Sequence, residues 1–144
     1  MKFLLYPLSI VYNLITSLRN LLFDLGLINS VQYKIPTIGV GNLSTGGTGK
    51  SILVDYLIEL LKIKYKITTL SRGYNRDTSG FIQATSKSSA YEIGDEPYQF
   101  YSKHPEINVV VCEDRRKGMK LILNNLPDTE LCIWDDVFQH RFVK

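Results

Sequence analysis

Apolar residues recur along the chain in two alternating patterns, one typical of strands and the other of helices. Short runs of β-branched and other apolar residues predict strands at 34–40, 66–70, 107–112 and 130–134. Apolar residues spaced three and four positions apart predict helices at 50–64, 95–102 and 115–124. In the first of these helices, one face is formed by Ile52, Leu53, Tyr56, Leu57, Leu60 and Leu61. Strands that alternate with helices indicate an α/β fold with a parallel sheet covered on both faces.

A stretch rich in Ser, Thr and Gly covers residues 77–90, before the helix predicted at 95–102. This composition predicts a loop, within which residues 81–84 are expected to form a short strand. The chain contains no internal repeat and no long low-complexity tract. We therefore expect residues 31–144 to form one domain.

The first 30 residues are predicted to form a separate amphipathic helix, from about Pro7 to Gly26. The apolar stripe consists of Val11, Leu14, Ile15, Leu18, Leu21, Leu22 and Leu25. No residue from 3 to 18 is charged, but this run is shorter than the ~20 apolar residues that span a bilayer and contains polar side chains. Two alternatives stay open for the helix, packing on its own domain and binding at a lipid interface. A secretory signal is disfavoured because no small-residue cleavage site follows the apolar run.

The composition, 44% hydrophobic and 22% charged over 144 residues, allows a sizeable core and excludes a disordered chain. The net charge of +3 is spread along the sequence, so no nucleic-acid partner is expected from charge. Cys112 and Cys132 lie in apolar runs, without a Cys-x-x-Cys spacing or a Cys/His cluster. This pattern argues against a zinc site and against a disulfide scaffold.

The strongest chemical signal is the Gly-rich sequence from Gly41 to Ser51, between the first strand and the helix at 50–64. In this context the pattern predicts a phosphate-binding loop, in which backbone N–H groups face the phosphates, Lys50 adds a positive charge and the Ser51 hydroxyl reaches Mg²⁺. The predicted nucleotide-binding residues are Ser44, Thr45, Gly46, Gly47, Thr48, Gly49, Lys50 and Ser51. The usual pattern has Gly at the position of Ser44, and a Gly-rich turn without a ligand is the alternative.

A pair of carboxylates, Asp135 and Asp136, directly follows the apolar strand at 130–134. Parallel sheets place their ligands at the carboxyl ends of strands, so one of these aspartates is expected to hold the Mg²⁺ that Ser51 contacts. A solvated turn is the alternative for such a pair. The phosphate-binding loop upstream in the same βαβ order favours the metal site.

Other polar residues are less informative by themselves. Asp95 is explained by capping of the helix that follows it, and its spacing alone does not establish a catalytic role. The loop that contains Arg72 and Arg76 follows the second strand, so the two guanidinium groups are candidates for phosphate or substrate contacts. His104, which precedes Pro105, is expected at the surface.

Four motifs, taken in order, resemble tetraacyldisaccharide 4'-kinase, the lipid A 4'-kinase family of Gram-negative bacteria. The matching runs are Gly41-Asn42-Leu43 with Gly46 to Ser51, Leu70-Ser71-Arg72-Gly73-Tyr74, Gly94-Asp95-Glu96-Pro97, and Asp135-Asp136-Val137-Phe138-Gln139-His140. The similarity covers essentially the whole chain but only the N-terminal part of a usual family member. The family also departs from the first Gly of the loop pattern. Val137, Asn75 and Trp134 differ from the residues usual at their positions.

The resemblance implies a P-loop NTPase-type domain at 31–144, preceded by a membrane-interface helix at 1–30. It implies transfer of the ATP γ-phosphoryl group to the 4'-hydroxyl of an acylated glucosamine disaccharide 1-phosphate, with Mg²⁺. Lys50 would hold phosphates, Ser51 with Asp135 or Asp136 would hold the metal, and Asp95 would act in a catalytic dyad with a His from the family's C-terminal half. His140 belongs to the fourth motif and is not that His. The expected location is peripheral, on the cytoplasmic face of the inner membrane.

Two alternatives to an active kinase remain at this stage. One is a membrane-associated P-loop NTPase that acts as a switch or binding module, although no base-reading Asn/Thr-Lys-x-Asp sequence is present. The other is a nonfunctional remnant, in which no final helix covers the last strand and residues 135–144 lie at a cut edge. The kinase prediction itself is for an incomplete fragment, whose catalysis needs the family's C-terminal half.

Overall fold

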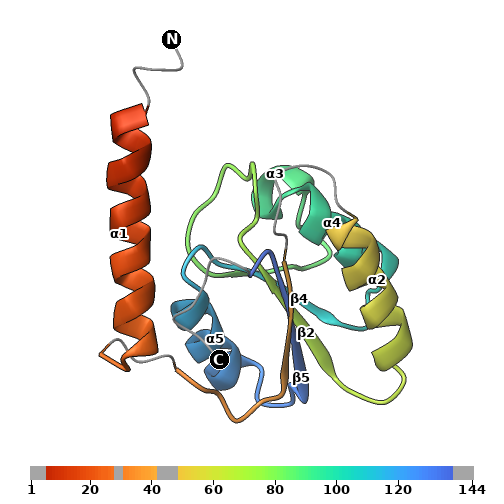
Figure 1. The fold of residues 1–144 in the computed structure, drawn as a ribbon. Coiled ribbons are helices and arrows are strands. Elements are labelled where there is room, and N and C mark those ends of the chain that lie inside the picture. Colours follow the sequence, from red (N-terminus) through yellow and green to blue (C-terminus); the bar gives the residue numbers. More distant parts are fainter. Residues whose placement is uncertain (1–5, 28–30, 42–48, 138–144) are drawn as a thin grey trace. The chain divides into compact units, whose positions relative to one another are not determined.

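The computed structural model describes residues 6–27, 31–41 and 49–137 (Figure 1). The chain divides into two compact units, one containing the N-terminal helix up to Gln32 and the other beginning at Tyr33. The division lies close to residue 30, while the roles predicted for the two parts remain predictions.

The N-terminal unit contains helix α1, Tyr6–Asp24. Gly26 follows it with a φ of +69°, the left-handed conformation with which glycine commonly ends a helix. Side chains of the predicted apolar stripe are exposed, from 51% for Leu21 to 65% for Leu14, except for Leu22, which is partly buried. Within the described residues, no helix combines the length and the apolar character that crossing a bilayer requires.

The second unit is built on a five-stranded sheet with the order β1-β5-β2-β4-β3. The strands are β1 (Thr37–Val40), β2 (Ile67–Ser71), β3 (Ile82–Gln83), β4 (Asn108–Val111) and β5 (Leu131–Asp135). β1, β5, β2 and β4 are parallel, as the alternating pattern predicts, but β3 pairs with β4 in the antiparallel direction. The expectation of an entirely parallel sheet is therefore wrong at β3. No helix between β2 and β3 carries the chain back to the amino edge, so β3 has to run in the opposite direction.

Strand β5 lies inside the sheet and pairs with both β1 and β2. All five of its residues are buried. The alternative in which the chain lies at a cut edge from Asp135 onward is therefore wrong for Asp135, which is the last residue of β5. Residues 138–144, to which that prediction also applied, lie outside the described residues.

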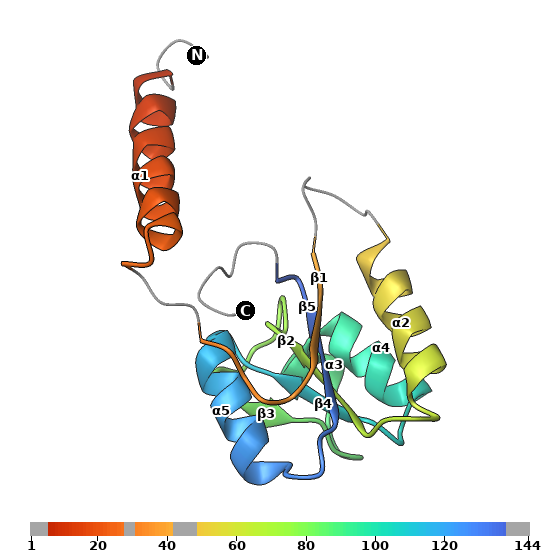
Figure 2. The same ribbon diagram turned by 60° about the horizontal axis from the view of Figure 1, so that its bottom comes forward.

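Helices cover both faces of the sheet. α2 (Lys50–Leu61) and α4 (Asp95–Lys103) lie on one face, and α5 (Arg115–Asn125) lies on the other (Figures 1 and 2). Asp114 caps α5 by accepting hydrogen bonds from the backbone N–H groups of Arg116 and Lys117. A fourth helix, α3 (Ala90–Ile93), is too short to produce a periodic pattern and was not predicted.

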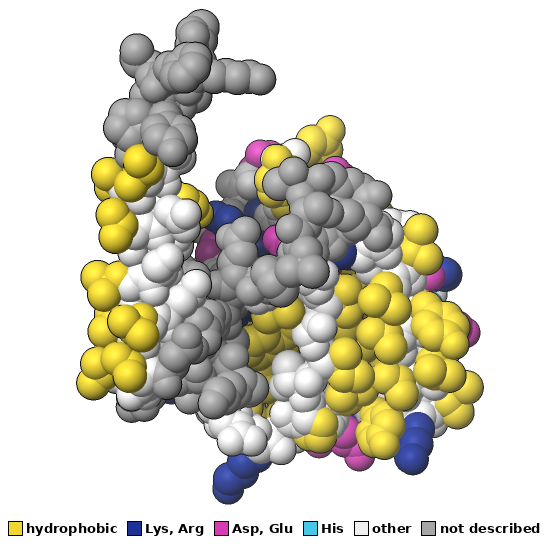
Figure 3. All heavy atoms as spheres, viewed as in Figure 1, with side chains coloured by type: hydrophobic (Ala, Val, Ile, Leu, Met, Phe, Trp, Pro, Cys, Tyr) yellow, Lys and Arg dark blue, Asp and Glu magenta, His cyan; other side chains and the backbone are white. Residues whose placement is uncertain are grey.

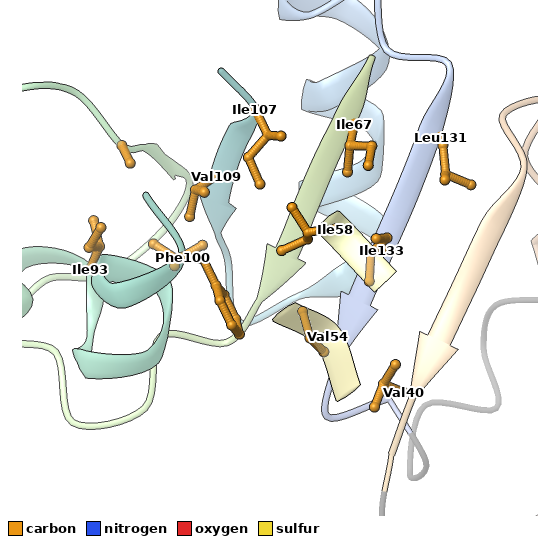
Figure 4. Close-up of a cluster of buried hydrophobic side chains, with 12 residues drawn as sticks. Val40, Val54, Ile58, Ile67, Ile93, Phe100, Ile107, Val109, Leu131 and Ile133 are labelled. Atoms are coloured by element: carbon orange, nitrogen blue, oxygen red, sulfur yellow. The ribbon is translucent and has the colours of Figure 1, made fainter. Parts of the chain in front are cut away.

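The core between the sheet and the helices α2 and α4 is formed by Val54 and Ile58 of α2, Phe100 of α4 and apolar strand residues (Figure 4). The apolar face predicted for residues 50–64 is thus displaced from the buried side. Ile52, Leu53, Tyr56 and Leu60 are exposed, and apolar side chains gather on the surface over α2 (Figure 3). α2 is apolar around most of its circumference, so periodicity did not identify the face that packs on the sheet.

His104 is buried, which corrects the prediction of a surface position. It lies directly after α4, and its Nε2 atom is 2.8 Å from Oδ1 of Asp55 on α2. Its Nδ1 atom is 3.2 Å from Nζ of Lys62. These contacts join α2 to the end of α4, and they connect residues more than 40 positions apart in the sequence.

Candidate functional site

Three elements bring polar side chains to the carboxyl edge of the sheet. β1 and β5 are parallel, with Val40 opposite Asp135, so the chain leaves β1 beside the paired aspartates. α2 begins at Lys50 and Ser51, and the first turn of α4 contains Asp95 and Glu96. The predicted phosphate-binding residues Ser44, Thr45, Gly46, Gly47 and Thr48 lie outside the described residues.

Lys50 and Asp136 form an ion pair, with Nζ 2.8 Å from Oδ1. The hydrogen bond to Asp136 raises the pKa of Lys50. Gly49, which precedes α2, has a φ of +79°, a conformation that favours glycine, so the sequence Gly49-Lys50 suits the start of this helix. The first turn of α2 and the end of β5 therefore meet through opposite charges.

Ser51 donates a hydrogen bond to Oε1 of Glu96, which joins the first turn of α2 to the first turn of α4. We did not predict a role for Glu96, although it belongs to the Gly-Asp-Glu-Pro motif. Asp95 is the first helical residue rather than the N-cap, which is Gly94, and no side-chain capping bond is made. The capping explanation of Asp95 is therefore wrong. Its exposed side chain has no hydrogen bond or ion pair with other described residues.

Asp135 is only 3% exposed, and its Oδ1 atom has no hydrogen-bond partner among the residues that the structure describes. Burial and, second, the nearby Glu96 carboxylate raise the pKa of Asp135 to about 6. A buried carboxylate oxygen without a partner fits a cation ligand, because a cation would offset the cost of burying the charge. Asp135, Asp136 and Ser51 thus present oxygens suited to Mg²⁺.

A complete metal site of protein ligands is not seen: no three His, Cys, Asp or Glu side chains converge in the described part of the chain. Mg²⁺ usually keeps several waters and binds through one or two carboxylates together with substrate phosphates. The oxygens at this edge therefore suit a metal that arrives with a nucleotide.

Arg115 also makes contacts at this edge of the sheet, and we did not predict a role for it from the sequence. It is 2% exposed, and its guanidinium donates to the carbonyl oxygens of Cys112, at 2.7 Å, and Asp135, at 2.9 Å. These bonds tie the chain that follows β4 to the end of β5. The only sequence signal was a charged residue soon after an apolar strand, which is shared by many solvated turns.

Arg72 and Arg76 belong to a cluster of residues that is separate from the contacts of Lys50 with Asp136. The loop that follows β2 contains both, and Arg76 pairs with Glu113, just after β4. Gly73 and Gly94 are close neighbours: a Cβ added at Gly94 would lie 2.9 Å from the Tyr74 carbonyl oxygen and 3.2 Å from Gly73. The second and third sequence motifs are therefore in direct contact.

Comparisons with known proteins agree with this arrangement. A family model described as LpxK, tetraacyldisaccharide-1-P 4'-kinase, matches residues 1–144. Curated tetraacyldisaccharide 4'-kinases of Flavobacterium psychrophilum and Flavobacterium johnsoniae are 51% and 48% identical over 97% and 98% of the chain, which spans 41% and 42% of their lengths. The crystal structure of the "apo" form of LpxK from Aquifex aeolicus in complex with ATP matches with a TM-score of 0.86 and 42% identity. That match covers 97% of this chain and 45% of the Aquifex chain.

Proposed function

Because the chain belongs to the tetraacyldisaccharide-1-P 4'-kinase family, we propose that it carries the nucleotide-binding part of a lipid A 4'-kinase. The reaction would transfer the γ-phosphoryl group of ATP to the 4'-hydroxyl of an acylated glucosamine disaccharide 1-phosphate. Since the chain spans 41% of the Flavobacterium psychrophilum kinase, the proposal concerns the first part of such an enzyme. A switch without a lipid acceptor is not favoured by this family assignment.

The observation that carries the proposal is the meeting of Lys50, Ser51, Asp135 and Asp136 at one edge of the sheet. Lys50 lies at the start of α2, where helix N–H groups attract phosphate, and its ammonium group would bind the nucleotide phosphates. It exchanges its contact with Asp136 for the phosphates when the nucleotide arrives. Residues 44–48 would supply the backbone N–H groups of the same loop.

Ser51 and the two aspartates are the proposed metal ligands. When Mg²⁺ is bound, it neutralises charge on the phosphates. The Ser51 oxygen would bind the metal through a lone pair while its hydroxyl hydrogen still donates to Glu96, and the oxygen of Asp135 that lacks a partner among the described residues would gain one. Glu96 then orients Ser51 from the neighbouring helix.

Asp95 is the proposed catalytic carboxylate, by its match to the family's Gly-Asp-Glu-Pro motif. Its position supports this role, because it precedes Glu96 in the first turn of α4 and no described residue occupies its carboxylate. A carboxylate so placed is able to accept the proton of an acceptor hydroxyl or to orient that hydroxyl.

Equilibrium binding of MgATP to the 144-residue chain tests the proposal. Lys50→Ala is expected to weaken binding at least about tenfold, because it removes a charge-assisted contact with phosphate. Lys87→Ala, which removes an exposed lysine from the loop before α3, is the matched control and should bind as the parent does. Equal ATP affinity in the Lys50→Ala variant and the parent chain would refute the nucleotide site.

For α1 we propose binding at a membrane interface, on the cytoplasmic face of the inner membrane. The exposed apolar stripe supports this, because each side chain that enters the lipid contributes up to about 1.5–3 kcal/mol. In liposome flotation, Leu18→Glu with Leu22→Glu should abolish binding. The control variant Asn13→Glu with Ser17→Glu adds the same charge outside the stripe and should keep most of the liposome binding. Wild-type protein that stays in the aqueous fraction would disprove the anchor.

A further inference from the structure

A pocket of about 300 Å³ lies beside the loop that follows β2, away from the contacts of Lys50. It is lined by Arg72, Gly73, Tyr74, Asn75, Arg76, Thr78 and Glu113. Its size is at the lower end of the range for small-molecule sites. Arg72 of the second sequence motif and Arg76 just after it therefore line one small cavity.

Arg76 is held inside this pocket with unused hydrogen-bonding capacity. Its side chain is 2% exposed, and its NH2 atom donates to the Gly80 carbonyl oxygen at 2.7 Å and to the Glu113 carboxylate. The Nε and NH1 atoms are buried and have no partner. Buried N–H groups without partners are costly, and a ligand with several acceptor oxygens would satisfy them.

The backbone around Arg76 is shaped to hold that side chain. Gly73 has a φ of +72°, and a Cβ there would lie 2.6 Å from Cδ of Arg76 and 2.9 Å from the Ile93 carbonyl oxygen. Only glycine leaves space for the arginine to pass under the loop. Glu113 also accepts from the Gly80 N–H at 3.0 Å, so it fixes one side of the guanidinium and the loop together.

The charge of the pocket favours an anion. Arg72 and Arg76 contribute two positive charges, and among the described residues Glu113 is the one carboxylate that lines the pocket. Arg72 is exposed and makes no hydrogen bond or ion pair with the residues that the structure describes. A guanidinium fork matches the geometry of phosphate oxygens, whereas a carboxylate ligand would offer fewer acceptors.

We infer that this pocket binds the phosphate that the acceptor sugar already carries before the reaction. The inference rests on the proposed function, because the description of the matching family, tetraacyldisaccharide-1-P 4'-kinase, names an acceptor that already carries a phosphate. Such an acceptor needs an anion site separate from that of the nucleotide. In the order β1-β5-β2, the loop after β2 starts two strand spacings, about 10 Å, from the nucleotide loop after β1. The two sites are thus separated on the scale of a disaccharide.

The test is an NMR titration of ¹⁵N-labelled 144-residue chain with glucosamine 1-phosphate, repeated with saturating MgATP. The expected result is a change at the amides of residues 72–80 and 113 that persists with MgATP. Arg72→Ala should weaken binding at least tenfold, and Arg76→Lys, which keeps the charge and most of the buried stem, should weaken it similarly. ATP affinity should be unchanged in both, and Lys87→Ala should bind the sugar phosphate normally.

Two further probes separate the sources of the phosphate. Glucosamine, which lacks the phosphate, should produce no change at the pocket, and inorganic phosphate should bind more weakly than the sugar phosphate. Tighter binding of inorganic phosphate would overturn the assignment to the acceptor. Competition by MgATP, unchanged affinity in Arg72→Ala, or no response of the pocket amides would also overturn it. If any of these results were found while Lys50→Ala still lost ATP binding, the pocket assignment would fail and the proposed function would stand.

Discussion

At the scale of single residues, Asp135 is a buried carboxylate at the edge of the sheet where we propose that a cation binds. It ends β5 inside the sheet, its Oδ1 atom lacks a partner, and burial raises its pKa to about 6. Lys50 lies at the same edge of the sheet but forms its ion pair with Asp136. The sequence predicted the lysine and both aspartates because their motifs are local. It did not predict Glu96 or Arg115, because their roles depend on contacts between separate elements.

The raised pKa of Asp135 predicts an unusual dependence of stability on pH in the metal-free protein. Below about pH 4 the folded and unfolded chains both hold the proton, so no penalty exists. Between 3.8 and about 6 the unfolded chain releases the proton first, and the free energy of unfolding falls as pH rises. The full penalty, about 3 kcal/mol, is present above pH 6.

Urea unfolding of the parent and of Asp135→Asn between pH 4 and pH 7.5, with EDTA, measures this penalty. The amide cannot ionise, so the free energy of unfolding of the variant relative to that of the parent should increase as pH rises. Titrations common to both chains cancel in this difference. Parallel stability curves for the two proteins would contradict the assignment.

At the scale of elements, close contacts between loops join the motifs. Gly73 of the arginine loop and Gly94 before α4 approach each other, so the loop after β2 and the first turn of α4 hold one arrangement. Asn75 in this loop has a φ of +59°, a conformation that asparagine tolerates better than most residues. Sequence analysis identified these elements but not their contacts. His104 was wrongly placed at the surface because its partner, Asp55, lies 49 residues away.

The contact between these two loops predicts a specific cost for a methyl group at Gly94. Gly94 and Gly80 have similar φ values, +94° and +81°, so alanine at either position pays a backbone cost of about 1–3 kcal/mol. A Cβ at Gly94 would also meet the Tyr74 carbonyl oxygen at 2.9 Å, whereas one at Gly80 meets nothing within 4 Å. Overpacking should therefore lower the free energy of unfolding of Gly94→Ala by about 1–3 kcal/mol beyond the loss in Gly80→Ala.

Chemical denaturation of the two variants beside the parent provides the comparison. The Gly80→Ala variant serves as the control for the cost of a side chain at a positive φ. Equal losses in the two variants would show that the loop and the start of α4 do not press on each other.

At the scale of the whole molecule, the α/β class and the family resemblance are confirmed, and the strand order explains why the site forms. Insertion of β5 between β1 and β2 places its two aspartates beside the segment that leaves β1. The sequence predicted each strand, but strand order and the reversal of β3 arise from pairings between distant segments. Local patterns define elements, whereas their neighbours depend on the complete fold.

If the nucleotide site is assembled by this strand order, MgATP should stabilise the entire second unit and not only its loops. A ligand at 100 times its Kd adds about 2.7 kcal/mol to the free energy of unfolding, which raises the Tm by several degrees for a chain of this size. ATP with EDTA should give a smaller rise, because the buried Asp135 oxygen then lacks its cation. Differential scanning calorimetry measures both shifts.

Two variants separate the contributions to this stabilisation. Asp136→Asn should lose most of the difference between MgATP and ATP with EDTA, because it removes one proposed metal ligand. Arg72→Ala, in the separate pocket, should keep the full rise of the parent. An equal rise in Tm with and without Mg²⁺ in the parent would contradict a metal site at the end of β5. A reduced rise in Arg72→Ala would instead show that this arginine contributes to nucleotide affinity, since the stabilisation by a ligand depends on its Kd.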